Sequence, residues 1–364
     1  MKKLILNIIV ISTIIHSKTF AMYSATSDWN KFLTHPNKFV ATVEQFGFVL
    51  GNGSVRGTFG FKGNNVIFNS VDSVKNIQIN PTISAGLGYT SDIFSIGLGY
   101  SYQYNHKYLS THTPVLMFNF LNKQFRLVIP VSIATTDKYY SDSSLENKND
   151  YKYLGLSTDT HIRYYTGLDI MPQLRFYVKY GINQKDYKTV GSVDTIKESA
   201  SSLGLDFRAY FYTVYEGIEV EPFIKITYNT ALDAEGKVGN TSTRVSAGKE
   251  YGLRAPKTDE EKSSAYIKNP FALTILPALG LTAKTDIIEL YVEPSLGYKL
   301  SEDGFNKLLH SLAWAAYGEI YITPIENLEW YFEADVGSTD DPTKSQVLEF
   351  ATSTGITWYL PKFD

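Results

Sequence analysis

Ser157, Asp159 and His161 bring together the three side-chain types of a hydrolytic triad. Because alternate residues of a strand share a face, the predicted strand here presents all three on one side. A triad needs hydrogen-bonded neighbours, and residues i and i+2 lie about 6.6 Å apart along a strand. We therefore attribute the pattern to a polar strand face, and we expect no catalytic residues and no enzyme activity.

Metal and cofactor sites are equally poorly supported by the sequence. The chain has no cysteine, and its six histidines show no repeated spacing of the kind that metal ligands need. The segment Gly97-Leu98-Gly99 resembles part of a nucleotide-binding fingerprint, but it falls inside a predicted strand instead of a strand-to-helix turn. We interpret these glycines as places where strands bend or pack closely, and we expect no metal and no cofactor.

Charged side chains on the face opposite the apolar one form two groups along the chain. If the apolar face contacts lipid, these groups line a lumen, with bases on one arc and acids on the other. Such a wall would create a transverse field, and the excess of acids mildly favours cations. The alternative is that the charges pair with each other inside a plugged barrel. The basic residues are Arg126, Arg163, Arg175, Lys179 and Arg208, and the acidic ones are Glu219, Glu221, Glu289, Glu293, Glu319, Glu329, Glu333 and Asp335.

Strands with two distinct faces must carry these charges. In residues 82–104, Leu87 and Leu98 belong to an apolar face that alternates with serine, threonine and glycine. About ten residues of apolar face ending in tyrosines suits a lipid-facing strand. The alternation returns in residues 125–133, 174–182, 203–211, 218–228, 273–281, 288–298 and 328–336.

The connections alternate between short and long. Short ones are expected at residues 91–92, 121–123, 168–172, 216–217, 284–286 and 324–327, and long polar ones at 135–152, 184–202, 231–269, 301–306 and 338–345. This rhythm predicts an all-β, antiparallel, transmembrane outer-membrane β-barrel of about 14–16 strands, with short periplasmic turns and long external loops. Within its strands, Pro130, Pro222, Pro277 and Pro294 predict local bulges. The alternative is a soluble periplasmic or peripheral β-protein whose apolar faces pack together.

Composition narrows the setting of the chain. Residues 1–21 have the basic start and short apolar run of a cleaved secretory signal, which leaves residues 22–364 as one barrel domain whose part 22–76 is the least regular. The 27 tyrosines and 21 phenylalanines, against four methionines, suit strands. A net charge of −3 offers no basic stripe, so we expect no nucleic-acid partner.

Two segments near the mature N-terminus resemble the variable surface proteins of intestinal spirochaetes: Asp28-Trp29-Asn30-Lys31-Phe32-Leu33 and the glycine- and phenylalanine-rich stretch at residues 47–61. The resemblance implies an abundant, surface-exposed outer-membrane protein that contacts the host immune system and forms homo- or hetero-oligomers with related copies. We hypothesise that the protein is surrounded by outer-membrane lipid and displays an antigenic surface, and that it also allows passive porin-like diffusion.

Overall fold

The computed structural model describes residues 29, 32–33, 38–42, 45–63, 81–106, 108–137, 148–189, 193–235, 266–338 and 348–359. Residues 1–21, predicted to be the signal peptide, lie outside them. The strands are β1 (Lys38–Thr42), β2 (Gln45–Gly51), β3 (Val55–Lys62), β4 (Thr82–Thr90), β5 (Ser95–His106), β6 (Leu109–Phe120), β7 (Phe125–Thr136), β8 (Lys148–Tyr165), β9 (Gln173–Thr189), β10 (Ile196–Tyr210), β11 (Thr213–Tyr215), β12 (Ile218–Ala231), β13 (Phe271–Lys284), β14 (Ile288–Glu302), β15 (Leu308–Ile325), β16 (Leu328–Ser338) and β17 (Leu348–Tyr359).

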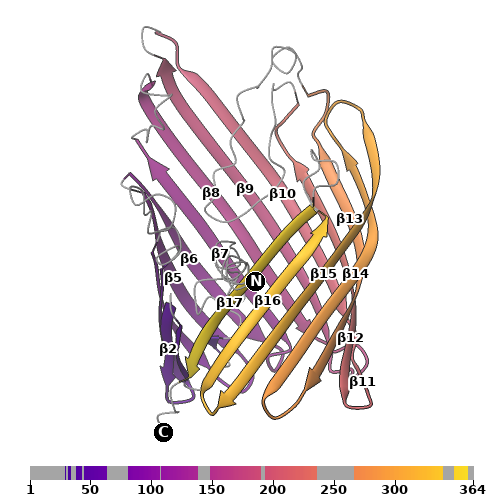
Figure 1. Cartoon of the computed structure of the whole chain (residues 1–364). Helices are drawn as coiled ribbons and strands as arrows, with labels where there is room; N and C mark the ends of the chain where they lie inside the picture. Colours follow the sequence, from indigo (N-terminus) through magenta and orange to yellow (C-terminus); the bar gives the residue numbers. More distant parts are fainter. Residues whose placement is uncertain are drawn as a thin grey trace, which may run out of the picture.

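Neighbouring strands pair antiparallel along the described chain, and the sheet curves into a barrel (Figure 1). β10 pairs with β12, while β11 is a three-residue strand beside β12, so 16 strands form the wall in the described residues. β1 pairs with both β17 and β2, through only three and four residue pairs. The predicted all-β antiparallel barrel of 14–16 strands is therefore confirmed.

The apolar face of the strands points outward. Leu87 and Leu98 lie opposite each other on β4 and β5 and are 68% and 65% exposed. On the other face of the same strands, Ser84 and Ser101 are buried and share a hydrogen bond of 2.8 Å. An apolar exterior over a polar interior inverts the arrangement of a water-soluble protein and is the pattern of a wall surrounded by lipid.

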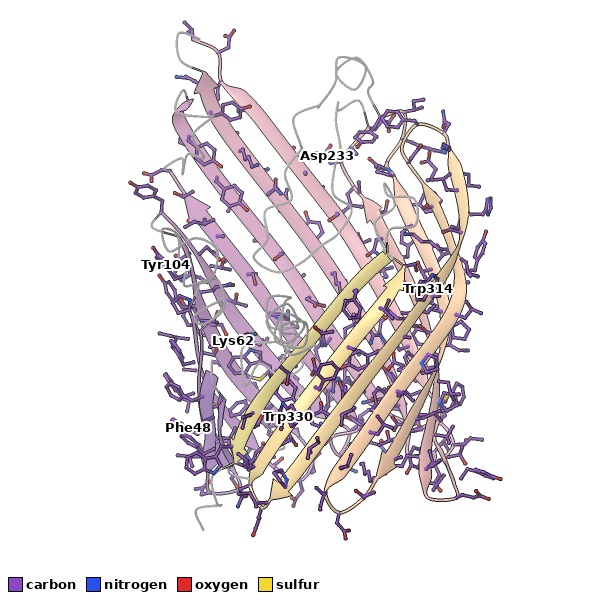
Figure 2. The ribbon with its side chains drawn as sticks, viewed as in Figure 1. Phe48, Lys62, Tyr104, Asp233, Trp314 and Trp330 are labelled. Carbon is purple, nitrogen blue, oxygen red and sulfur yellow. The ribbon has the colours of Figure 1, made fainter. Side chains whose placement is uncertain are left out.

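Aromatic side chains lie at two levels of the outer surface. Figure 2 shows Phe48 and Trp330 toward the end where the short turns lie, and Tyr104 and Trp314 nearer the opposite end. Trp330 and Trp314 are 51% and 37% exposed. Aromatic girdles at two levels are typical of the two membrane interfaces of an outer-membrane barrel.

The connections differ from their predicted bounds at the end of the barrel with the long loops, which we call the long-loop end. Residues 184–202, predicted to be one long loop, largely continue β9 and β10 as a hairpin. β8 likewise begins at Lys148, inside the predicted loop 135–152. Polar composition misled the prediction because strands that extend beyond the lipid need no apolar face, and Figure 1 shows β8, β9 and β10 rising above β16 and β17.

The prediction of bulges at prolines was wrong. Across β6 and β7, His112 pairs with Ile133 and Val115 with Pro130, so the register is the same on both sides of the proline. The registers around the other three prolines are also continuous. A proline removes one hydrogen bond, whereas an extra residue would change the face that the following side chains occupy. In the described strands, register shifts lie instead at Tyr104/His106, Asn149/Lys152 and Ile322/Ile325. No helix within the described ranges has the length and apolar character to span a bilayer.

Candidate functional site: the charged inner wall

The inner face of the barrel carries the charged residues that sequence alternation assigned to it. All lie on the face opposite the exposed apolar side chains. The basic group spans β7 to β10 with Arg126, Arg163, Arg175, Lys179 and Arg208. The acidic group spans β12 to β16 with Glu219, Glu221, Glu289, Glu293, Glu319, Glu329, Glu333 and Asp335. The predicted bases and acids thus occupy separate groups of neighbouring strands, while Asp159 and Asp206 lie on the inner face among the bases, and Lys225 and Lys299 among the acids.

Four of the arginines lie directly opposite one another across three strand pairs. Arg126 on β7 pairs with Arg163 on β8, Arg163 with Arg175 on β9, and Arg175 with Arg208 on β10. We call this set the arginine row. It lies close to the short turns, because Arg126 is the second residue of β7 and Arg208 is near the end of β10. Lys179 lies off the row, opposite Asp159 and Gly204.

Aromatic rings hold three members of the arginine row. The guanidinium carbons of Arg126, Arg175 and Arg208 lie 4.5, 4.3 and 4.9 Å from ring centroids, the rings being Tyr165, Tyr210 and Tyr177. Such cation–π contacts attract a positive charge without neutralising it.

Polar contacts add to these aromatic ones. Arg175 also donates to Gln173 at 2.7 Å, and Arg208 forms an ion pair with Asp206 at 2.7 Å. Among the described residues, Asp206 is the one carboxylate in ion-pair contact with the row. The row therefore retains a large excess of positive charge.

Arg163 differs from its neighbours in the row. It is only 7% exposed, and its Nε makes no hydrogen bond within the described part of the chain. Because buried guanidinium groups are normally paired, this donor is an unusual feature of the wall.

The spacing argument applied to Ser157, Asp159 and His161 was wrong for one pair. His161 Nε2 lies 3.2 Å from Asp159 Oδ1, because side chains lean along a strand and can meet although their Cα atoms are far apart. His161 Nδ1, however, has no hydrogen-bond partner within the described residues. The geometry therefore does not form the relay in which one imidazole joins a carboxylate and a serine hydroxyl. The described residues contain no cluster of metal-ligating side chains.

The acidic group is stabilised largely by hydroxyl donors. Tyr291 donates to Glu293 at 2.5 Å, Tyr317 donates to Glu319, and Tyr359 donates to Glu329 at 3.1 Å. A hydroxyl satisfies a carboxylate oxygen without removing its charge, so these carboxylates keep their negative field.

Two further contacts complete the description of the acidic group. Glu333 lies opposite Glu319 and accepts a hydrogen bond of 2.6 Å from Ser353. Lys284 Nζ lies 3.7 Å from Glu219 Oε1 and 3.5 Å from Glu289 Oε1, and it offsets part of the negative charge there.

An apolar patch interrupts the polar interior and was missed by the sequence analysis. Trp29, Phe32 and Leu33 are 2%, 0% and 1% exposed, and they join Val49 and Met117 in a buried cluster. The Thr90 hydroxyl donates to the Leu33 carbonyl at 2.9 Å. Residues that precede the first strand thus pack against the inner wall.

Glycines create the space for this packing. Gly86 lies opposite Gly99, and Gly88 opposite Gly97, on the inner face of β4 and β5. We call these four residues the glycine floor. A Cβ added at Gly99 would lie 2.6 Å from the Trp29 ring, and one at Gly88 would lie 2.2 Å from a Leu33 methyl group. The close packing predicted for these glycines therefore involves the N-terminal residues, a partner that the spacing alone did not suggest.

Comparison with known proteins identifies the family. Residues 2–359 match a family model described as the Serpulina hyodysenteriae variable surface protein. The chain belongs to this family. The suspected resemblance to spirochaete variable surface proteins is confirmed, and the family and the barrel together make this chain an outer-membrane surface protein. No curated protein matches the chain.

Several solved structures are similar to this variable surface protein. The translocator domain of the autotransporter NalP from Neisseria meningitidis is 12% identical, with 92% of each chain covered and a TM-score of 0.33. OmpT, an outer membrane protein of Vibrio cholerae, is 10% identical, with 89% of this chain and 97% of that chain covered and a TM-score of 0.37. The outer membrane channel DcaP of Acinetobacter baumannii is 10% identical, with coverages of 89% and 96% and a TM-score of 0.34.

Proposed function

We propose that this variable surface protein displays variable antigenic loops on the cell surface, and that its lumen lets small hydrophilic solutes diffuse passively. The charged inner wall inside an apolar exterior carries the diffusion proposal, because a barrel of about 16 strands is wide enough for an aqueous path. The membership of a surface-protein family supports the display. Contact with the host immune system and oligomers with related copies are parts of the same proposal.

Display requires the long-loop end to face outward. In the connection between β9 and β10, Val193 is 92% exposed among the described residues, so this end presents an accessible segment to whichever compartment it faces. Trypsin added to intact cells is expected to cut at this end before it cuts any strand. Full protection of intact cells, with cleavage only after lysis, would contradict the orientation.

Diffusion requires that the residues at the glycine floor leave a path. Trp29, Phe32 and Leu33 occupy one side of the lumen, next to β4 and β5. We therefore expect a small conductance that rises when Trp29→Ala removes part of this obstruction.

Purified, folded protein in planar bilayers tests this proposal. The wild type is expected to give stepwise conductance with a weak preference for cations. Glu289→Gln, Glu293→Gln and Glu333→Gln together should reduce that preference, because each removes a negative charge from the inner wall. A triple change of outward-facing residues, Thr158→Ser, Thr160→Ser and Ile162→Val, is the control. Silence from well-folded wild type and Trp29→Ala protein would leave display as the function.

A further inference from the structure

We propose that the arginine row binds a small solute carrying two or more tetrahedral oxyanion groups, such as phosphate or sulfate groups. The row lies near the short turns, so the proposal places the entry of the solute at that end of the barrel. The proposal therefore does not require that the lumen conducts from one side of the membrane to the other.

Like charges directly opposite each other destabilise a pair of strands. The arginine row contains three successive pairs of this kind: Arg126 with Arg163, Arg163 with Arg175, and Arg175 with Arg208. The sheet thus places like charges together at a cost in stability, and one carboxylate, Asp206, is in ion-pair contact with the row among the described residues. A bound polyanion would offset this repulsion.

The geometry of the row suits oxyanions with several charged groups. Three strand spacings of about 4.8 Å separate Arg126 from Arg208, so the row is roughly 14 Å long. A guanidinium carries a planar fork of donors that matches two oxygens of a phosphate or sulfate group. Arg208 uses its Nε and Nη2 donors on Asp206, so Arg126, Arg163 and Arg175 are the arginines that can offer donors to a solute. Two such groups on one solute can contact neighbouring arginines at the same time.

The arginine side chains are also ordered before a ligand binds. The rings of Tyr165 and Tyr210 fix Arg126 and Arg175 without consuming their charge. Arg163, in the interior of the row, is 93% buried and keeps a free Nε donor within the described residues. Because these side chains are already ordered, binding loses little rotamer entropy.

Calorimetry on the folded full-length mature protein in detergent tests the proposal, with inorganic pyrophosphate as the probe and acetate as the comparison. We expect saturable binding of pyrophosphate and much weaker binding of acetate. Arg163→Gln and Arg175→Gln should each reduce the pyrophosphate affinity at least tenfold, since each removes charge-assisted hydrogen bonds. Lys152→Gln is the matched control, because Lys152 lies on the same strand as Arg163 but is exposed near the long-loop end.

Three results would overturn the proposal: no saturable pyrophosphate binding by well-folded wild type, equal binding of acetate, or an equal loss of affinity in Lys179→Gln. The last result would show a diffuse positive field instead of a site, since Lys179 lies off the row. If the arginine variants do not fold, phenylglyoxal modification of the wild type replaces them. Pyrophosphate should protect Arg175, which is only half-buried, from the reagent, and unchanged modification would contradict the site.

Discussion

Gly99→Ala is expected to displace the N-terminal residues from the inner wall while the barrel still folds. The added Cβ would lie 2.6 Å from two atoms of the Trp29 ring, whereas carbon atoms in contact prefer about 3.5–4.0 Å. The ring must therefore move by about 1 Å. Gly99 has no left-handed backbone conformation, so alanine itself causes no strain in β5.

The size of this effect follows from the cost of overpacking, which is about 1–3 kcal/mol. That cost lowers the docking equilibrium of the Trp29 segment about 5- to 150-fold. Acrylamide quenching of Trp29 fluorescence measures the displacement, in a background where the three other tryptophans are phenylalanine. Gly99→Ala should increase the quenching of Trp29 clearly above that of the parent.

Gly57→Ala is the matched control for this prediction. Its added Cβ would lie 3.5 Å from Leu87, an ordinary van der Waals contact, so Trp29 should stay protected. A double-mutant cycle completes the test, because the destabilisation caused by Gly99→Ala should disappear once Trp29→Ala has removed the ring. Unchanged quenching in Gly99→Ala, or additive effects in the cycle, would refute the docking of Trp29 on the glycine floor.

Three further predictions follow from the two faces of the wall and from the arginine row. Leu98→Lys should cost up to about 4 kcal/mol of unfolding free energy in lipid, whereas Gln103→Lys on the inner face of the same strand should cost little; equal costs in urea titrations would contradict the outward apolar face. Asp206→Asn should raise pyrophosphate affinity several-fold in calorimetry, because Arg208 loses its carboxylate partner, and unchanged affinity would count against the row. A protease site inserted after Val193 should be cleaved on intact cells without loss of the folded barrel, and protection there would oppose the proposed orientation.

The sequence contained enough information to predict the wall but not its register. Alternation identifies the two faces of a strand, because successive side chains point in opposite directions. If Leu87 and Leu98 point to lipid, Ser84 and Ser101 must therefore point inward. The arginine row, by contrast, depends on register across β7–β8 and β9–β10, where the sequence predicted long connections, and long connections do not fix pairing. The arginines were therefore assigned to one arc, and their direct opposition could not be predicted.

The packing of Trp29 was difficult to predict for a different reason. The glycines that it packs against, Gly86 and Gly99, lie more than fifty residues away, and three strands, β1 to β3, come between them in the sequence. The sequence did contain one signal, the repeated glycine on the inner face of β4 and β5. A wall that contacts only water could carry polar side chains there, so glycine at these positions indicates that something packs closely against them. Four glycines at opposed positions leave room for a large ring.

Quenching of single tryptophans by brominated lipid tests the central claim most directly. Of the four tryptophans, Trp314, Trp330 and Trp358 are 37%, 51% and 56% exposed on the outer face, whereas Trp29 is 2% exposed inside the barrel. Four variants that each keep one tryptophan would be folded into vesicles of brominated or ordinary phosphatidylcholine. We predict strong quenching by brominated lipid for the three outer residues and almost none for Trp29. Quenching of Trp29 as strong as that of Trp330, or protection of all four, would contradict a barrel with an apolar exterior and the N-terminal residues within it.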